Sequence, residues 1–398
     1  MRGEIILKGM KAMLWKNGVL ALALALVGCV SNPDYNQALP EGAPALLEVE
    51  ADEIPEFDMD WGMRDELGAS LEQSLRWIDR PHAKNFFPIE GVTWERARAS
   101  LVRFKEILET TSSRMEFDER IRDEFTWYVS AGWNGRGDGV RFTGYCTPLL
   151  TGSLEQGGPY QFPLYALPPD LKKDKSGATL GWQVGDQLLP YPGRSAIDGG
   201  GLLKGKGLEL VWLANPLDAF IAHVNGSAFI TLPDGSLFRL GYAGKNGAPY
   251  HSLGKELADD GILKRDGLNL QRIRSWAETA DPELVREYLF RNPSYVFFQP
   301  IKSTPHGSLD VPVTAQRSIA TDKTLFPRGS VCFVDAELPG AFDGERIRMQ
   351  QFMMDQDTGG AIRTAGRTDL YMGIGPEAEA IAGRINSPGQ LYYLFLKE

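Results

Sequence analysis

Apolar residues recur at spacings of three and four in two segments near the start of the folded region, residues 67–78 and 93–108. They are Leu71, Leu75 and Ile78 in the first segment, and Ala97, Leu101, Phe104 and Leu108 in the second. This spacing places the apolar side chains on one face of an α-helix. The sequence therefore predicts two amphipathic helices whose apolar faces cover a core.

From residue 140 onward the pattern changes to short apolar runs separated by Gly and Pro, which is typical of β structure. The predicted strands are 162–169, 208–213, 228–232, 237–242, 296–298, 330–334, 347–354 and 390–396. Pro233-Asp234-Gly235-Ser236 predicts a hairpin turn between two of them. Two helices interrupt the strands. Leu268, Leu270, Ile273 and Trp276 line one, and the other starts at the N-cap Asp281 before Pro282.

The N-terminus has the features of an export signal. Lysines precede an apolar run at 18–27, which is too short to span a bilayer comfortably. The run ends in Leu26-Val27-Gly28-Cys29, which resembles a bacterial lipobox with acylation of Cys29. The alternatives are a signal peptide that happens to contain a cysteine and an uncleaved anchor. We expect a signal peptide at 1–28, a Pro-rich and acidic tether at 29–60, and, because Val30 follows the cysteine, an outer-membrane destination.

Composition narrows the class of protein further. The 398 residues include 44 Gly and 25 Pro, only 24% are charged, and the net charge is -10, which argues against nucleic acid as a partner. The four histidines have no metal-ligand spacing, so we expect no metal and no cofactor. Cys146 and Cys332 either pair or stay free, and the sequence leaves both states open.

Two aspartates are candidate catalytic residues. Asp357 begins an Asp-Thr-Gly-Gly sequence, and Asp369 follows twelve residues later in a strand-like run. Carboxylates that share one cleft act as general acid and general base in the cleavage of glycosidic bonds. Taken alone, an Asp before two glycines is most often only a turn.

Five motifs occur together in this chain. They are Phe-Thr-Gly-Tyr-Cys-Thr-Pro at 142–148, Gly-Leu-Glu-Leu-Val-Trp-Leu at 207–213, Tyr-Ala-Gly-Lys-Asn-Gly at 242–247, Asn-Pro-Ser-Tyr-Val-Phe-Phe at 292–298 and Asp-Thr-Gly-Gly-Ala-Ile at 357–362. In this order they resemble the membrane-bound lytic murein transglycosylase A (MltA) family over about residues 88 to 398.

The resemblance implies a mainly β (α+β) fold with two domains and a groove between them. A double-psi β-barrel domain would comprise 61–146 and 266–398, and its C-terminal three-aspartate (3D) module would cover about 310–398. A smaller β-rich domain would be inserted at 147–265.

The resemblance also implies the activity. Lytic transglycosylases cut the β-1,4 bond between N-acetylmuramic acid and N-acetylglucosamine and leave a 1,6-anhydro end. Asp369 would be the single catalytic acid and base. Asp357 would support it, and Asp322 would be a structural or hydrogen-bonding residue near the barrel.

A third set of residues is expected to bind the glycan. These residues are Thr143, Gly144, Tyr145, Gln161, Asn225, Ser227, Lys245, Asn246, Gly359 and Gly360. Tyr145 would stack on a sugar, although core packing is its ordinary alternative. The chain departs from the family pattern at Asn225-Gly226-Ser227-Ala228, where Gln-Gly-Ser-Gly is usual, and at Cys146, where a second aromatic is usual. Both changes leave the subsite contacts in doubt.

Two other readings stay open: a polysaccharide hydrolase that uses two aspartates, and a non-catalytic peptidoglycan-binding lipoprotein. The expected location is the periplasmic face of the outer membrane, with a lipid anchor on Cys29. The expected partner is the peptidoglycan strand, and cell-wall synthesis or division proteins are further candidates. Exo or endo action is not determined by the sequence.

Overall fold

The computed structural model describes residues 33–57, 61–174, 177–340 and 345–398. All the elements described below belong to one compact unit, Asp34–Glu398. The expected signal peptide and Cys29 lie outside the described residues. Within those residues, no helix combines the length and the apolar character that crossing a membrane requires.

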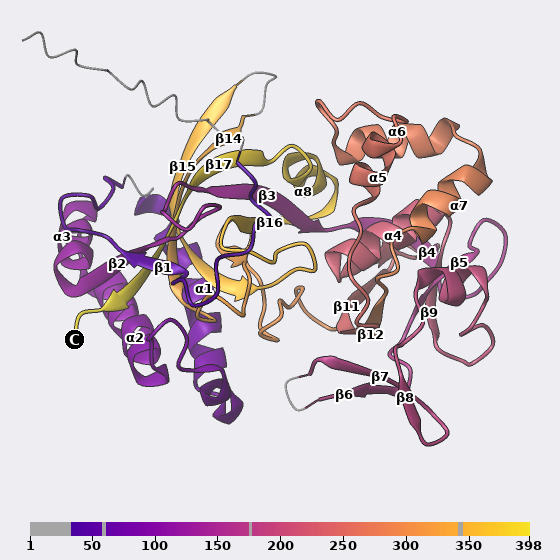
Figure 1. Ribbon diagram of the computed structural model, residues 1–398, viewed down its shortest axis with the longest axis horizontal. Helices are drawn as coiled ribbons and strands as arrows, with labels where there is room; N and C mark the ends of the chain where they lie inside the picture. The colour runs from indigo at the N-terminus through magenta and orange to yellow at the C-terminus, as the bar shows by residue number, and fades with distance from the viewer. Residues whose placement is uncertain (1–32, 58–60, 175–176, 341–344) are drawn as a thin grey trace, which may run out of the picture. The chain divides into compact units, whose positions relative to one another are not determined.

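Six strands close into a barrel that unites early and late parts of the chain (Figure 1). They are β3 (Val140–Thr147), β13 (Ser318–Ala320), β14 (Val331–Pro339), β15 (Arg346–Asp357), β16 (Arg367–Ile374) and β17 (Asn386–Leu396). The order is β17-β14-β15-β13-β16-β3, and β3 pairs again with β17. This closed circuit confirms the predicted barrel and removes its free edges.

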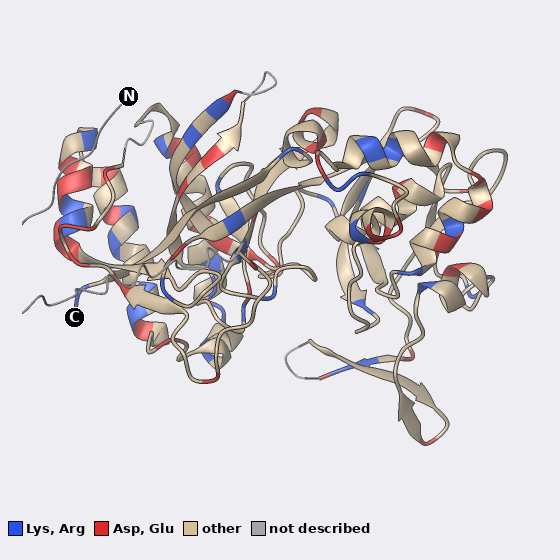
Figure 2. Ribbon diagram, turned by 45° about the horizontal axis from the view of Figure 1, so that its top comes forward, with Lys and Arg blue, Asp and Glu red and all other residues tan. Residues whose placement is uncertain are grey.

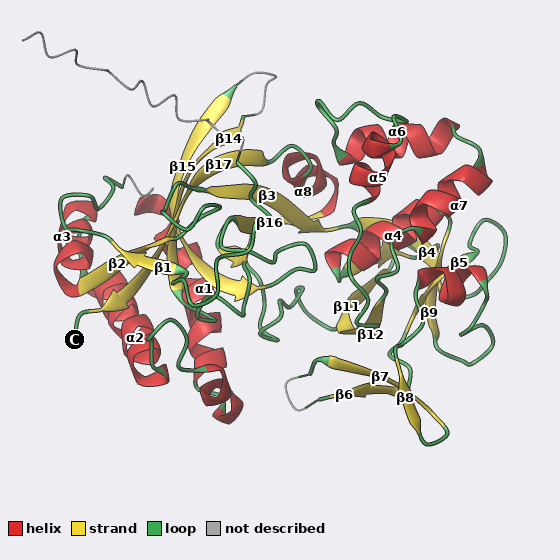
Figure 3. Cartoon of the chain, in the orientation of Figure 1, coloured by secondary structure: helices red, strands yellow, loops and turns green. Residues whose placement is uncertain are grey.

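Further elements cover the barrel. Strands β1 (Leu46–Glu48) and β2 (Phe125–Ser130) extend the sheet from β17, and helices α1 (Arg64–Ile78), α2 (Trp94–Thr110) and α3 (Arg114–Glu124) lie outside it (Figure 3). Helix α1 packs against β15 and α2 against β17. Both predicted helices are confirmed. Helix α3 was not predicted, because it buries only Phe117 and Ile121 and is otherwise mostly charged.

The described part of the segment expected to be a tether (29–60), residues 33–57, packs on the barrel domain instead. Strand β1 pairs with β2, and Ala45 is fully buried. Phe57 is buried among aromatic core residues, with its ring 5.5 Å from that of Trp127. Prolines and acidic residues suggest a loose linker, but these apolar side chains hold the described part of the segment in place.

The insert is built on a six-stranded sheet in the order β12-β11-β10-β4-β9-β5. The strands are β4 (Leu149–Ser153), β5 (Phe162–Tyr165), β9 (Glu209–Leu213), β10 (Ala228–Thr231), β11 (Leu237–Lys245) and β12 (Val296–Pro300). A smaller sheet comprises β6 (Leu171–Lys173), β7 (Thr179–Val184) and β8 (Gln187–Leu189). The hairpin turn predicted at 233–236 joins β10 to β11, which pair antiparallel.

The insert extends well beyond the expected boundary at residue 265. Helices α4 (Pro216–Asn225), α5 (Leu253–Asp259), α6 (Leu270–Thr279) and α7 (Pro282–Phe290) share one apolar cluster, and β12 pairs with β11. The insert therefore ends near residue 300. The physical reason is that α7 buries its apolar face in this cluster with α4 and α5, and that the partly buried apolar residues of α6 pack against the same cluster.

Helix α8 (Gly375–Ala382) links the barrel to the insert, because it packs on β3 and β16 and its Glu379 pairs with Arg274 of α6 at 2.9 Å. Arg274 also pairs with Asp218 of α4 at 2.6 Å. Figure 2 shows acidic and basic residues interspersed along the helices of both domains. Cys146 and Cys332 are both free and buried, which decides the question that the sequence left open.

Candidate active site

Asp369 lies in the middle of β16, between β13 and β3. It is in register with Ala320 on one side and with Thr143 on the other. Side chains alternate along a strand, so Thr368 and Leu370 enter the core while Asp369 points to the other face and stays partly accessible. The barrel thus holds this carboxylate on a rigid strand.

The environment of Asp369 favours its protonated form. Burial raises the pKa of Asp369 to about 6, the neighbouring Arg367 opposes this rise and the like charge of Asp357 adds to it. Its Oδ1 contacts the Thr143 hydroxyl, and Arg367 Nη2 donates to the same hydroxyl oxygen at 3.2 Å. Within the described residues, no hydrogen-bond partner is seen for Oδ2. One oxygen of Asp369 therefore stays available for proton transfer.

The carboxylate of Asp357 differs from that of Asp369, because it accepts hydrogen bonds from three donors. Oδ1 accepts from the backbone N–H groups of Ser308 at 2.7 Å and Thr358 at 2.8 Å, and Oδ2 accepts from the Tyr145 hydroxyl at 2.8 Å. Burial raises the pKa of Asp357, while these three bonds and the positive charge of Lys323 oppose the rise. Donors directed at both oxygens suit a carboxylate that orients others rather than one that transfers a proton.

Asp322 is buried, and its carboxylate holds a turn. Oδ1 accepts from the Thr324 backbone N–H at 3.0 Å and from the Thr324 hydroxyl at 2.7 Å. The next residue, Lys323, forms a buried ion pair with Asp355, which also accepts from Thr321 at 2.7 Å. This pair could not be predicted from the sequence, because 32 residues separate two otherwise ordinary charged residues.

Tyr145 joins the two aspartate strands. Its hydroxyl donates to Asp357, and its ring centroid lies 5.1 Å from that of Tyr371 on β16. The Tyr371 hydroxyl lies 3.1 Å from that of Thr147, which lies 3.1 Å from the Ser227 hydroxyl in the insert. Ser227 therefore belongs to a polar chain that connects the insert to β16, the strand that carries Asp369.

Several other residues expected to bind glycan have packing or backbone contacts in the structure. Gly144 serves packing, since a Cβ there would lie 2.8 Å from Cα of Ala382 in α8. Asn225 accepts from the Cys146 backbone N–H at 3.4 Å. Asn246 is buried, and its amide donates to the carbonyls of Pro192 and Pro293 and accepts from two backbone N–H groups. Asn246 thus shapes its loop and has no side-chain atom left for a ligand.

The loop at 357–362 brings insert residues to the aspartates. Lys245 is partly buried, and burial, followed by the charge of Arg363, lowers its pKa. A Cβ on Gly360 would lie 3.4 Å from Cβ of Tyr250. Burial, and secondarily the charge of Asp369, raises the pKa of Tyr250. Tyr250 was not predicted from the sequence, although an aromatic residue directly after Gly247-Ala248-Pro249 is a usable signal.

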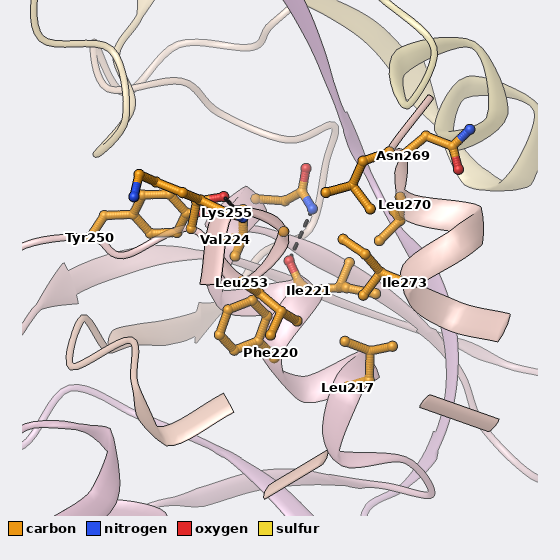
Figure 4. A pocket seen from close by; sticks show the side chains of 14 residues that line it. Leu217, Phe220, Ile221, Val224, Tyr250, Leu253, Lys255, Asn269, Leu270 and Ile273 are labelled. Carbon is orange, nitrogen blue, oxygen red and sulfur yellow. Dashed lines mark hydrogen bonds between the residues drawn. The ribbon is translucent and has the colours of Figure 1, made fainter. Parts of the chain in front are cut away.

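Two cavities lie apart from the carboxylates. The first, of about 310 Å³, has an apolar floor of Phe220, Ile221 and Leu253, with Tyr250 and Asn225 also in its wall (Figure 4). The second, of about 250 Å³, includes Gln161 in its lining. Neither lining contains Asp357 or Asp369, so the structure does not bring Gln161 to the aspartates. Among the described residues, no three His, Cys, Asp or Glu side chains gather as a metal site requires.

Comparison with known proteins agrees with this geometry. The MltA specific insert domain family matches residues 141–299, and the 3D domain family matches residues 317–395. Membrane-bound lytic murein transglycosylase A of Vibrio cholerae is 34% identical over 276 residues, which are 68% of this chain and 70% of the relative. The chain belongs to the membrane-bound lytic murein transglycosylase A (MltA) family.

Other members of the MltA family support the assignment. The protein of that name from Escherichia coli is 37% identical over 261 residues, 64% of this chain, and the match spans 65% of the relative's length. The crystal structure of a membrane-bound lytic murein transglycosylase from Agrobacterium tumefaciens has a TM-score of 0.73 at 27% identity, covering 88% of this chain and 98% of the other. The crystal structure of E. coli MltA with bound chitohexaose has a TM-score of 0.69 at 27% identity, and the match covers 92% of this chain and 100% of the other.

The contact between Tyr145 and Asp357 leads to a prediction for this MltA-family protein. Tyr145→Phe keeps the ring but removes the hydroxyl that donates to Asp357. A hydrogen bond to a charged group contributes about 1.5 kcal/mol or more, so we expect the catalytic efficiency kcat/KM to fall about tenfold. Tyr128→Phe, whose hydroxyl only meets Arg96 at 3.5 Å, is the control. An unchanged kcat/KM in Tyr145→Phe would show that Asp357 does not act through this bond.

Proposed function

We propose that this protein is a lytic transglycosylase that cleaves the β-1,4 bond between N-acetylmuramic acid and N-acetylglucosamine in peptidoglycan. One observation carries the proposal. The carboxyl of Asp369 has a pKa near 6 and an unoccupied oxygen, beside an Asp357 whose oxygens already accept three hydrogen bonds. A single proton-transferring carboxylate suits a reaction in which the substrate supplies its own nucleophile.

The proposed reaction proceeds with balanced proton transfers. Asp369 donates its proton to the glycosidic oxygen as the bond to C1 of the muramic residue breaks. The C6 hydroxyl of the same residue then bonds to C1, and its proton passes to the Asp369 carboxylate. The products are a free C4 hydroxyl and a 1,6-anhydro end, and no water is consumed. Proximity gives the intramolecular hydroxyl a high effective concentration, so no second carboxylate has to activate a nucleophile.

Hydrolysis by two aspartates is the competing function. An inverting hydrolase needs a carboxylate that holds and deprotonates a water. The three donors on Asp357 leave it poorly suited to that role. Digestion of purified sacculi, followed by mass analysis of the muropeptides, separates the two reactions. We expect ends that lack the mass of one water, whereas reducing ends of full mass would support hydrolysis and no release at all would support a binding protein.

The remaining binding roles are part of the same proposal. Thr143, Tyr145, Lys245 and Gly359 surround the two aspartates or their loop and would face the glycan, and Ser227 would support them from the insert. We also propose that Cys29 carries the lipid anchor and that the protein works in the bacterial cell envelope on the periplasmic face of the outer membrane. Relatives named membrane-bound support this placement. Labelling with a radioactive fatty acid, lost in Cys29→Ala, tests the anchor.

The raised pKa of Asp369 predicts a pH profile. The free enzyme must hold a proton on Asp369 in order to donate it, so kcat/KM should fall as pH rises through about 6. The like charge of Asp357 raises the pKa of Asp369, so Asp357→Asn should move this fall to lower pH. Initial rates on soluble glycan strands between about pH 4 and pH 8, the range in which such carboxyl groups titrate, measure the fall in the unchanged protein and its shift in Asp357→Asn. The stability of each protein is checked at each pH. A fall at the same pH in both proteins would contradict the coupling.

A further inference from the structure

We propose that residues 34–39, which we call the N-terminal strap, position the catalytic carboxylate through Asn36. This inference rests on the proposed role of Asp369 and adds a positioning residue to it. Six residues separate the strap from β1, which begins at Leu46, and its Asn36 lies seven residues after Cys29 in the sequence. It belongs to the segment whose composition suggested a loose tether.

The strap is seated on the barrel at the start of β16. The Thr364 hydroxyl donates to the Tyr35 carbonyl at 2.6 Å, and Leu39 packs against the barrel core. Gly366 allows this close approach, because a Cβ there would lie 2.9 Å from the Tyr35 carbonyl oxygen. The guanidinium of Arg141 lies 6.0 Å from the centroid of the Tyr35 ring. Backbone, core and aromatic contacts thus fix the strap on both sides of Asn36.

Asn36 reaches the catalytic group through two intermediates. Arg367 Nη1 donates to Asn36 Oδ1 at 3.3 Å, and Nη2 of the same guanidinium donates to the Thr143 hydroxyl oxygen at 3.2 Å. The Thr143 hydroxyl contacts Oδ1 of Asp369. Since a guanidinium is planar and rigid, holding one of its nitrogens orients the other. The strap therefore sets the position of the hydroxyl that orients Asp369.

The charges around Arg367 explain why its guanidinium needs the hydrogen-bond acceptor that Asn36 of the strap provides. Burial, followed by the positive charge of the neighbouring Arg367, lowers the pKa of Arg141. Asn386 holds Arg141 by an Nε–Oδ1 contact of 2.5 Å, and Asn36 holds Arg367. Without Asn36 we expect the guanidinium of Arg367 to swing away from Arg141 and from Thr143.

Two readouts separate positioning from a purely structural role. Misplacement of a catalytic group by a fraction of an ångström lowers the rate without changing how the glycan binds, so Asn36→Ala should reduce kcat about tenfold with KM nearly unchanged. The groups that face Asp369 electrostatically are Arg367, Asp357, Tyr145 and Tyr250. Only Arg367 is positive among them, so loosening it should move the fall in kcat/KM to higher pH.

The experiment uses the full chain carrying Asn36→Ala, Asn36→Asp or Gln37→Ala, assayed on soluble glycan strands across pH. Asn36→Asp should restore kcat, because a carboxylate accepts from a guanidinium at least as well as an amide does. Gln37→Ala, an exposed neighbour in the strap, should behave as the unchanged protein does.

The outcomes distinguish this proposal from the one it rests on. Absence of anhydro products from the unchanged protein would overturn the proposed function. Normal products with equal kcat and an equal pH profile in Asn36→Ala would overturn the positioning role alone. A fall in kcat that Asn36→Asp fails to rescue, with no shift in the pH profile, would also overturn it, since a loss of strap packing explains that result.

Discussion

Replacing Asp369 by Asn is expected to lower the release of anhydromuropeptides by about 10³-fold or more, because in the proposed reaction one carboxyl serves as acid and then as base. The amide keeps the size of the side chain, and its oxygen can still meet the Thr143 hydroxyl. An amide cannot give up a proton to the glycosidic oxygen or take one from the C6 hydroxyl. Release is measured from purified sacculi by mass analysis of the soluble products.

The same variant should keep or gain stability, and this separates lost chemistry from lost structure. The pKa of Asp369 is raised to about 6 in the folded protein. A carboxyl with a raised pKa binds its proton more tightly in the folded state, so stability falls as pH rises from the unfolded pKa of about 4 through the folded one. At pH 7 the uncharged Asn avoids that cost, whereas at pH 4 the two proteins should melt alike.

Asp310→Asn is the matched control for that experiment. Asp310 is an exposed carboxylate of the barrel domain and pairs with Arg80 at 3.3 Å on the surface. Exposed ion pairs contribute about 1 kcal/mol or less, so this variant should retain full activity. Near-normal release by Asp369→Asn would remove Asp369 from the mechanism, and an equal loss in Asp310→Asn would point to a general effect of charge.

Helices and the separate strands of this protein were predictable, because periodicity depends on local sequence. Helices α1 and α2 begin and end within a few residues of the predicted segments. Asp281 accepts from the Glu283 backbone N–H at 2.8 Å, as expected of the N-cap. The barrel closure was not visible in the pattern itself and came from the resemblance. Strand β13 has only three residues, too few for an alternation to be recognised.

The insert boundary and the tether were predicted wrongly for the same physical reason. In both cases the segment is buried against parts of the chain that are distant in sequence. Helices α6 and α7 have ordinary amphipathic patterns that do not reveal whether the barrel or the insert covers them. Residues 34–57 look like a linker until Phe57 is seen among the core aromatics. The contacts of Asp357 depend on Tyr145 and Ser308, which are far from it in sequence. The motif predicted Asp369 as a candidate, and only the fold shows which groups surround its carboxyl.

Lys323→Met is expected to destabilise the barrel by about 3–5 kcal/mol, the cost of breaking a buried ion pair by removing one partner. Asp355 is fully buried, and Lys323 is only 5% exposed. Without the ammonium group, the Asp355 carboxylate would keep only two hydroxyl donors, from Thr321 and Tyr393. Two neutral donors compensate a buried charge poorly. The midpoint of urea denaturation, followed by tryptophan fluorescence, measures the loss.

The double variant Lys323→Met with Asp355→Leu tests whether the loss comes from the unpaired charge. Replacing both partners of a buried pair with apolar residues is often neutral, so most of the stability should return. Lys255→Met is the surface control, since Lys255 pairs with Asp259 in the exposed part of α5 and should change stability by about 0.5 kcal/mol or less. A double variant as unstable as Lys323→Met would mean that the pair is needed for packing. Equal stability of Lys323→Met and the unchanged protein would contradict the expected cost of an unpaired buried carboxylate.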